Sequence, residues 1–445
     1  MNRNIGYQRI GDQTMEANTT RRSAYHMGRR TRLFGAALAM ASLVAIPALG
    51  QAHAASSFGA TATLRSYASP RLAASLAVES GAVTQTSLIT ATLASTVPSI
   101  GDVNPYGVAV IPRSMGKLSA GSVLVSNFNS KDHAGMGTTI VQINPSAKTQ
   151  SVFAQLDPRQ LTGCPGVGQG SGVGLTTALT VLRRGYVVVG SLPTSDGSPV
   201  TAKAGCLIVL DTNGHVVRTI STPDINGPWD MTAYDQGNQA TLFVTNVLNG
   251  TVAAYDKTAK AGKVVNRGTV VRLTISLPQP GQGTPHVLSD MTIASGFAEQ
   301  ADPNALVLGP TGVGLGKDGT LYVADTVENR IAAIPNALTR MTDAYTGRDL
   351  TAGGDLNAPL GLTMTPNGDI LTANGGDGKL VRTTPDGSQV KSVLVDGIGK
   401  PAGAGNLFSL AISNGGHTVY FGNDGANSLN RVALSQTAPV IAQLG

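Results

Sequence analysis

The chain has 445 residues, of which 55 are glycine, 13% are charged and 4% are aromatic. Its formal net charge is +6, and residues 1–54 contribute +5 of this, because they hold seven arginines against one aspartate and one glutamate. The remaining chain is therefore close to neutral at +1. This gives no support for a nucleic-acid partner, since nucleic-acid binding needs a basic face on the folded domain.

The N-terminal segment has the pattern of an export signal. Three arginines between residues 29 and 32 are followed by an apolar run over 33–49 and then by Ala52-His53-Ala54. The run is short for a membrane span. We therefore expect residues 1–54 to be a signal peptide with an extended n-region, cleaved after Ala54. The mature protein would be exported, periplasmic or extracellular, without a transmembrane span. The true start is left open between Met1 and Met27.

Residues 55–96 are rich in Ala, Ser and Thr and are expected to form a tether. A strand is predicted at 87–93, where it would pair with the last repeat of the chain and close a circular fold. Residues 97–445 then form the folded domain.

One phrase recurs six times in this domain: a short apolar strand, a turn, and a second strand with a polar end. Alternating apolar runs broken by Gly, Asn and Asp are typical of strands joined by hairpins. The most regular copy contains Asp318-Gly319, a hairpin signal because glycine adopts positive φ without steric cost. The first strands are rich in small and β-branched residues, which fit a crowded channel. They are predicted at 104–110, 171–175, 227–232, 309–315, 358–363 and 406–411.

The spacing of the copies indicates a β-propeller. The positions taken as equivalent are Val108, Val173, Met231, Val313, Leu362 and Leu410, which lie 65, 58, 82, 49 and 48 residues apart. Repeats of roughly 40–50 residues with about four strands each are typical of propellers. A large β-sandwich would give no reason for the repetition. We predict one all-β domain, a six-bladed β-propeller with four-stranded antiparallel blades. The 82-residue gap is interpreted as an excursion from the third blade, with a degenerate seventh blade as the alternative.

The fourth copy carries a family resemblance. Its segment 321–325, Leu-Tyr-Val-Ala-Asp, followed by Asn329-Arg330-Ile331, resembles an NHL-type repeat. Residues 100–435 resemble NHL-repeat propellers and their relatives, the gluconolactonase/senescence-marker-type propellers. The resemblance is specific in the fourth copy and generic in the second. It implies a six-bladed propeller with a ligand site at one mouth of the channel. In lactonase-type members it implies a divalent ion held by carboxylates and amides, including a glutamate.

The predicted channel strands depart from that metal site. They carry no glutamate, and their one acid is Asp230, beside the only tryptophan, Trp229. An aromatic face beside a carboxylate suits polar organic ligands, so this pair is the best single candidate for a ligand contact. The competing interpretation is a tryptophan that fills space between blades.

The second strands end on a ring of polar residues, interrupted only by Gly190. Such side chains can cap the turn into the third strand, which we favour, or present oxygens to a hard cation or polar ligand at the mouth. The ligand-binding candidates are Trp229, Asp230, Asn127, Asn246, Asp325, Asn374 and Asn423. The metal candidates, for a divalent cation such as Ca²⁺, are Asp230 and Asp325.

The two cysteines, Cys164 and Cys206, are predicted to form a disulfide. Export places them where disulfides persist. Cys164 precedes the first strand of the second blade and Cys206 opens its third, so both lie at one end of the sheet. The bridge would hold the glycine-rich loop at 163–174.

These features favour a binding protein over an enzyme. No histidine falls on a predicted channel strand, and neither a phosphate-binding loop nor a serine-hydrolase elbow accompanies the repeats. We predict a monomeric, exported, NHL-like propeller that binds a protein, glycan or small-molecule ligand through one propeller face. A metal-dependent hydrolase or lactonase of the gluconolactonase type is the alternative.

Overall fold

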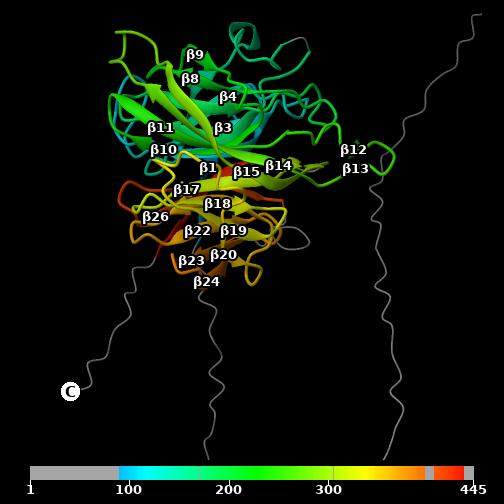
Figure 1. Cartoon of the computed structure of the whole chain (residues 1–445). Coiled ribbons are helices and arrows are strands. Elements are labelled where there is room, and N and C mark those ends of the chain that lie inside the picture. The colour runs from blue at the N-terminus through cyan, green and yellow to red at the C-terminus, as the bar shows by residue number, and fades with distance from the viewer. Residues whose placement is uncertain (1–89, 169, 304, 396–404, 435–445) are drawn as a thin grey trace, which may run out of the picture. The chain divides into compact units, whose positions relative to one another are not determined.

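A computed structural model describes residues 90–168, 170–303, 305–395 and 405–434. The predicted signal peptide and residues 55–89 of the predicted tether lie outside them. The described part contains 27 strands in six large sheets and one small hairpin (Figure 1). No helix in this part is long and apolar enough to cross a membrane.

The six sheets follow one another along the chain as blades, and all neighbouring strands in them are antiparallel. The first blade comprises β2 (Val103–Val110), β3 (Val123–Asn129), β4 (Thr139–Asn144) and β5 (Thr149–Gln155), followed by the 3-10 helix η1 (Pro158–Gln160). The second comprises β6 (Leu175–Val181), β7 (Val187–Ser191), β8 (Cys206–Leu210) and β9 (Val216–Ile220). The third comprises β10 (Pro228–Asp235), β11 (Gln239–Asn246), β14 (Val265–Ser276), β15 (Val287–Asp302) and β16 (Leu306–Leu308).

The other three blades have four strands each. The fourth comprises β17 (Pro310–Leu315), β18 (Leu321–Asp325), β19 (Arg330–Ile334) and β20 (Arg348–Ala352). The fifth comprises β21 (Pro359–Met364), β22 (Ile370–Asn374), β23 (Lys379–Thr383) and β24 (Gln389–Leu394). The sixth comprises β25 (Leu407–Ile412), β26 (Thr418–Asn423), β27 (Ser428–Ala433) and, outermost, β1 (Thr90–Ser95).

The blades close into a ring. The first strand of each blade lies innermost and contacts the first strand of the next, and β25 contacts β2. The sixth blade takes its outer strand from the other end of the chain, because β1 pairs antiparallel with β27. The six-bladed propeller is confirmed, and so is the predicted closing strand over its described residues.

The third blade contains the 82-residue gap. Its strands β14 and β15 are the longest in the described chain, and β16 adds a fifth strand beside β15. Between β11 and β14 the chain forms the hairpin of β12 (Tyr255–Asp256) and β13 (Ala261–Gly262), which projects at the side of the propeller (Figure 1). The gap is therefore an excursion of the third blade, and the seventh-blade alternative is wrong.

The second blade corrects the predicted alignment. Its inner strand is β6, so residues 171–175 belong mainly to the loop before it. The residue that pairs as Val108 does in the first blade is Leu179, opposite Val189, rather than Val173. The Gly-Val-Gly-Leu run at 172–175 resembles the start of an inner strand, but only its last residue, Leu175, belongs to β6.

Glycine is required at two kinds of place. A Cβ on Gly312 in β17 would lie 2.4 Å from the carbonyl oxygen of Leu360 in β21, so neighbouring inner strands approach too closely for a side chain. Gly319 has φ +80° in the turn between β17 and β18. Asp318 does not share the positive φ, so this turn has one left-handed residue, as in hairpin loops longer than two residues.

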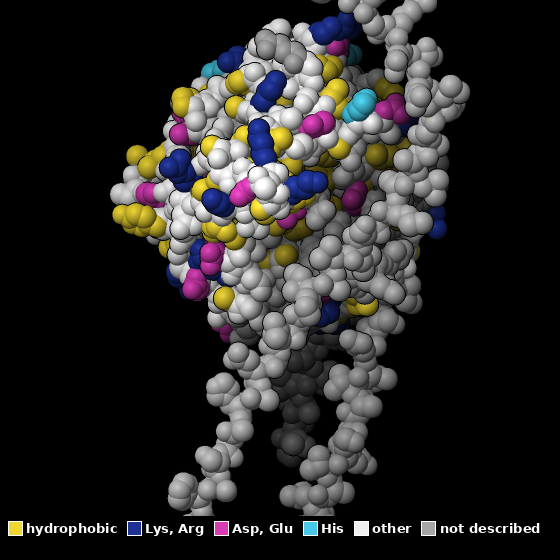
Figure 2. All heavy atoms as spheres, turned by 90° about the vertical axis from the view of Figure 1, so that its right-hand side faces the viewer, with side chains coloured by type: hydrophobic (Ala, Val, Ile, Leu, Met, Phe, Trp, Pro, Cys, Tyr) yellow, Lys and Arg dark blue, Asp and Glu magenta, His cyan; other side chains and the backbone are white. Residues whose placement is uncertain are grey.

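Six apolar clusters hold the blades together, one at each interface between neighbours. Each takes side chains from the facing surfaces of two consecutive blades, and the last joins the sixth blade to the first. A single blade cannot bury both of its faces, so closure of the ring supplies the core. On the face of the molecule in Figure 2, basic and acidic side chains are interspersed rather than gathered by sign.

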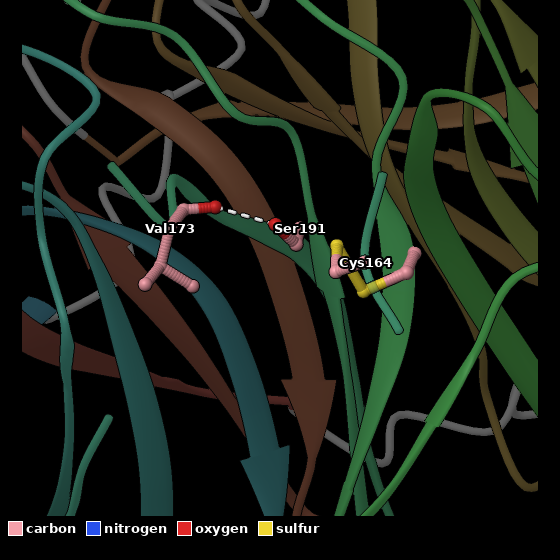
Figure 3. The surroundings of a disulfide bond; sticks show 4 residues. Cys164, Val173 and Ser191 are labelled. Atoms are coloured by element: carbon pink, nitrogen blue, oxygen red, sulfur yellow. Dashed lines mark hydrogen bonds between the residues drawn. A yellow bond between two sulfur atoms is a disulfide. The ribbon is translucent and has the colours of Figure 1, made fainter. Parts of the chain in front are cut away.

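The predicted disulfide is confirmed. Cys164 and Cys206 are bonded, with their Cα atoms 5.2 Å apart, and both are buried. Close by, the Ser191 hydroxyl donates to the carbonyl oxygen of Val173 at 2.5 Å (Figure 3). These contacts fix the loop before β6 to the start of β8 and the end of β7.

Candidate functional site

All six inner strands start at the same face of the propeller, and each is paired irregularly with its second strand over its first residues. In four of them, a side chain from this irregular segment enters one shared apolar cluster, here called the mouth cluster. These four are Tyr106, Trp229, Leu360 and Phe408. The mouth cluster thus joins side chains from the first, third, fifth and sixth blades.

The mouth cluster is aromatic and closely packed. The Tyr106 ring stacks on Phe128 with the centroids 4.6 Å apart, and its centroid lies 4.7 Å from that of Phe408. Trp229 is 4% exposed, and its indole Nε1 donates to the carbonyl oxygen of Val307 at 3.1 Å. This bond ties the inner strand β10 to β16.

The cluster leaves little space. Leu306 in β16 packs among these rings with φ +64°, a conformation that β-branched and other bulky residues seldom adopt. The cavity between Tyr106, Trp229 and Leu306 measures about 10 Å³. Such a volume holds one water molecule at most, so the mouth cluster is a packed plug rather than an organic-ligand pocket.

Asp230 follows Trp229 in β10 and is buried. One carboxylate oxygen accepts from the backbone N–H of Met231 at 2.8 Å, and the Val313 N–H of the neighbouring inner strand also donates to the carboxylate. Burial nevertheless raises the pKa of Asp230 well above its ordinary value. Asp230 is therefore held by backbone of two blades.

Two further acids lie near the Tyr106 hydroxyl. Burial, followed by the charges of Asp424 and Asp302, raises the pKa of Tyr106, which stays protonated. Burial also raises the pKa of Asp424 to about 6. Sequence reasoning missed both acids, because one follows β26 and the other ends the excursion strand β15.

The ring at the ends of the second strands is buried and bonds to nearby turns. The Asn127 Nδ2 donates to the Thr96 carbonyl oxygen at 3.0 Å and to the Thr139 hydroxyl at 3.1 Å. The Asn423 Oδ1 accepts from the Ala426 N–H at 2.8 Å. The Asn246 Nδ2 makes a long contact of 3.4 Å with its own strand.

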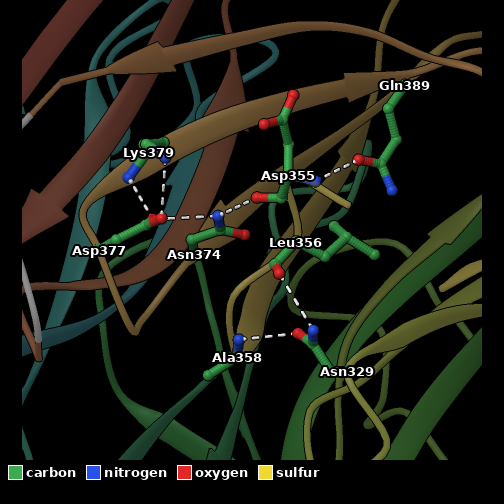
Figure 4. Close-up of polar contacts among 8 residues, drawn as sticks. All are labelled: Asn329, Asp355, Leu356, Ala358, Asn374, Asp377, Lys379 and Gln389. Carbon is green, nitrogen blue, oxygen red and sulfur yellow. Dashed lines mark hydrogen bonds and ion pairs between the residues drawn. The ribbon is translucent and has the colours of Figure 1, made fainter. Parts of the chain in front are cut away.

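Asn374 shows how such a residue organises a turn. Its Nδ2 donates to the carbonyl oxygen of Asp355 at 2.8 Å and to Oδ1 of Asp377 at 3.0 Å, and Asp377 pairs with Lys379 (Figure 4). Asn329 in the same view donates to the Leu356 carbonyl and accepts from the Ala358 N–H. The amides therefore connect successive blades through backbone groups.

Asp325 is paired with a cation. Its Oδ2 accepts from Nε of Arg330 at 2.9 Å, and Arg330 also contacts Asp349. Burial raises the pKa of Asp325 to about 6, although Arg330 opposes the shift. In the second blade the pairing opposite Leu175 places Ser191, not Gly190, in the ring. The functional roles of all these ring residues stay predictions.

The mouth does not fit the metal site that the family resemblance implies. The two metal candidates, Asp230 and Asp325, are engaged with backbone N–H groups and with Arg330 respectively. Within the described ranges, no group of three or more His, Cys, Asp or Glu side chains is placed to hold a metal ion. Aromatic side chains stand where several carboxylates and amides would be needed.

A groove opens on the same face, at the first blade. It has a volume of about 560 Å³ and lies between the segment before β2, the loop after β3 and the segment that follows β5. Its lining includes Ile100, Lys131, Met136, Leu156, Asp157 and Arg159. It combines apolar surface with charges of both signs, and its size is typical of ligand sites.

No protein-family model matches this chain, and no curated protein matches it. Similar solved structures include a gluconolactonase from Xanthomonas campestris, 13% identical over 78% of this chain and 89% of that chain, with a TM-score of 0.45. The calcium-binding protein regucalcin from Agrobacterium tumefaciens is 14% identical over 78% and 93%, with a TM-score of 0.47. Virginiamycin B lyase from Staphylococcus aureus is 14% identical over 78% and 99%, with a TM-score of 0.42. These likenesses concern the propeller fold alone.

A short phrase in the sequence accompanies three of the four mouth-cluster side chains on inner strands. Tyr106, Trp229 and Leu360 each follow a proline at the start of an inner strand and precede a glycine or an aspartate. Phe408 occupies the corresponding place without the proline. The fourth blade has the same phrase, Pro310-Thr311-Gly312, but Thr311 is not in the mouth cluster, so the phrase marks the starts of inner strands rather than the cluster itself.

Proposed function

We propose that this protein is an exported binding module that engages a partner through the propeller face on which the inner strands begin. The observation that carries the proposal is the first-blade groove of about 560 Å³ on that face. The channel mouth beside it is closed by the mouth cluster, so the open surface for a partner lies at the groove. The NHL-type character of the fourth blade fits such an interaction role.

Hydrogen bonds and an ion pair connect residues that line the groove. The Asp102 Oδ2 accepts from the backbone N–H of Thr138 at 2.8 Å and of Thr139 at 3.0 Å, which fixes its floor. The stem of Lys131 lies against Gly101, and Arg159 pairs with Asp157 at the opposite side. A partner would meet apolar surface between these charges, as in protein interfaces and glycan sites.

Site-specific photo-crosslinking in the producing cells tests this function. Lys131 is replaced by p-benzoylphenylalanine, and Lys317, in a turn at the opposite face, is replaced in the matched control. We expect adducts from position 131 and none from position 317, with mass spectrometry showing whether the partner is a protein, a glycan or a small molecule. Equal adducts at both positions, or none at 131, would contradict the proposal.

The alternative is a metal-dependent lactonase. Asp230 is its best residue, since it is the buried one of the two carboxylates on the described inner strands, the other being Asp235 at the end of β10. Its two backbone hydrogen bonds and its raised pKa make it a weak metal ligand. Hydrolysis of gluconolactone by the purified chain with Ca²⁺ or Zn²⁺, abolished by Asp230→Asn, would favour the lactonase. We expect no rate above that of buffer.

A further inference from the structure

Arg272 in β14 is a partly buried cation without a carboxylate partner. Its Nη1 donates to the carbonyl oxygen of Ala337 at 3.0 Å, and its Nη2 approaches the thioether sulfurs of Met291 at 3.8 Å and Met341 at 3.9 Å. Thioether sulfur is a weak acceptor. Burial lowers the pKa of the Arg272 guanidinium, and none of the ion pairs in the described part of the chain includes it. The positive charge of this residue is therefore poorly satisfied.

A second buried arginine, in the neighbouring blade, shows what Arg272 lacks. Arg330 in β19 pairs with Asp325 and Asp349, so the fourth blade supplies the anions for its own cation. In the third blade, Asp290 of β15 stands one residue from the position opposite Arg272. Because successive side chains of a strand point to opposite sides of the sheet, Asp290 faces away from Arg272. The anion that would complete Arg272 is not provided by these strands.

The loop between β19 and β20 carries exposed apolar surface next to Arg272. Met341 and Tyr345 are 73% and 75% exposed, the highest values among the large apolar side chains of the described residues. The Tyr345 carbonyl oxygen accepts from the Ser295 N–H at 3.0 Å, and the Asp343 carboxylate accepts from the Tyr345 N–H and the Ser295 hydroxyl. These bonds hold the loop along β15 and engage its acid, so the two apolar side chains remain open to solvent.

The surface made of Arg272, Met291, Met341 and Tyr345, here called the rim patch, has the composition of a protein-binding site. Arginine, methionine and tyrosine are enriched in protein interfaces, and arginine and tyrosine often dominate the binding energy. Methionine adapts its shape to apolar partners, and a guanidinium binds a carboxylate through two parallel hydrogen bonds. Arg340, whose guanidinium donates to a backbone carbonyl of the same loop, adds a second positive charge. The rim patch thus combines exposed apolar surface with positive charge.

We propose that the rim patch binds a protein partner through an acidic segment, in which an aspartate or glutamate stands beside an apolar side chain. The carboxylate pairs with Arg272, and the apolar side chain packs on Met341 and Tyr345. The patch lies between the third and fourth blades, whereas the groove lies at the first blade, so this inference is independent of the proposed function. Lys317, the control position in the crosslinking experiment, lies outside the patch, since its Nζ donates to the Pro366 carbonyl oxygen of the fifth blade.

Subtractive selection from a phage library of random peptides tests the rim patch on the purified chain. The library is first depleted on Arg272→Gln and then selected on the wild type. We expect the recovered peptides to have an excess of aspartate and glutamate beside leucine, isoleucine or phenylalanine. Their Kd, measured by fluorescence polarisation, should rise about tenfold or more in Arg272→Gln and should also rise with added salt.

Arg184→Gln is the matched control for the depletion step. The Nη1 of Arg184 also donates to a backbone carbonyl oxygen, that of Leu277, but Arg184 lies outside the rim patch. Depletion on Arg184→Gln should therefore remove the peptides that survive depletion on Arg272→Gln.

A second pair of variants protects the test against misfolding of Arg272→Gln. Met341→Gln changes an exposed side chain and should weaken peptide binding by about fivefold or more through lost apolar contact. Val390→Gln is its control, because Val390 is 52% exposed in β24 of the fifth blade, and it should bind the peptides as the wild type does. The proposal is overturned if no peptide is recovered above background, if the peptides show no acidic excess, or if they bind Met341→Gln as tightly as the wild type. Dimerisation of the wild type in sedimentation velocity, lost in Arg272→Gln, would also overturn it and assign the rim patch to a second copy of this chain.

Discussion

The interfaces between neighbouring blades and the mouth cluster are both buried, but they have different compositions. Between blades, mainly aliphatic side chains from alternate strand positions pack face to face. At the mouth, aromatic rings from the first, third and sixth blades pack with Leu360 of the fifth, and two acids near them, Asp230 and Asp424, have raised pKa values. Burying titratable groups opposes stability. The interfaces therefore account for the shape of the molecule, and the mouth face is where its function is to be sought.

The largest expected effect concerns an interface. Phe421 in β26 is 0% exposed and packs between the fifth and sixth blades. Phe421→Ala should lower the free energy of unfolding by about 3–5 kcal/mol, through lost burial and a new cavity. Urea unfolding followed by circular dichroism measures this change.

Val390→Ala is the control for this variant. Val390 lies in the outer strand β24 and is 52% exposed, so its truncation should change stability by less than about 0.5 kcal/mol. Similar losses in the two variants would show that the interfaces are not the main stabilising element.

The disulfide gives the next largest effect, on the mouth face. It links residues 42 apart and holds the loop before β6, where a Cβ on Gly172 would lie 2.5 Å from Met136 Cα. Replacing both cysteines by alanine should cost about 2–4 kcal/mol, because the unfolded chain gains freedom. An unchanged urea midpoint would mean that the bridged loop does not contribute to the stability of the blades. Reduction of the wild type by dithiothreitol provides an independent comparison.

Protonation should distinguish the mouth from the interfaces. The pKa of Asp424 is raised from 3.8 to about 6, so its protonated form is favoured in the folded state. Its contribution to stability is complete below pH 3.8 and is lost as the pH rises through about 6, a change of about 1–3 kcal/mol. Asp424→Asn should remove this part of the slope in unfolding experiments between pH 4 and 7.

Asp386→Asn is the matched control in an exposed turn. Hydrogen bonds from Thr384 and Ser388 lower the pKa of Asp386, so its contribution has the opposite sign and is lost only as the pH falls below 3.8. An Asp424→Asn variant with the wild-type slope between pH 4 and 7 would show that this acid is not coupled to folding.

The repeated phrase was sufficient to predict the propeller, because small residues on inner strands and glycine in turns are local requirements. The second blade was misaligned because the loop containing Val173 repeats the glycine pattern without being a strand. The mouth cluster was not predicted as a unit, since Tyr106 of the first blade and Phe408 of the sixth meet only when the ring closes. Glu299, which is buried in β15, gave no signal either. Its burial depends on the third and fourth blades meeting, because Gly309 at the start of the fourth blade lies against it.

The smallest expected effect tests how the excursion hairpin is held at the mouth. Trp229→Phe keeps an aromatic ring in the cluster but removes the Nε1 donor to the Val307 carbonyl oxygen. The free energy of unfolding should fall by about 1 kcal/mol, which is the net contribution of one buried hydrogen bond. The free energy of local opening at β16 should fall by more than the free energy of global unfolding, because this bond joins β10 to β16. Amide hydrogen exchange should therefore accelerate at Leu306 and Leu308 and stay unchanged at Val323 in the core of the fourth blade. Equal acceleration at both places would mean that the mouth cluster opens only when the whole propeller unfolds, as an interface between blades does.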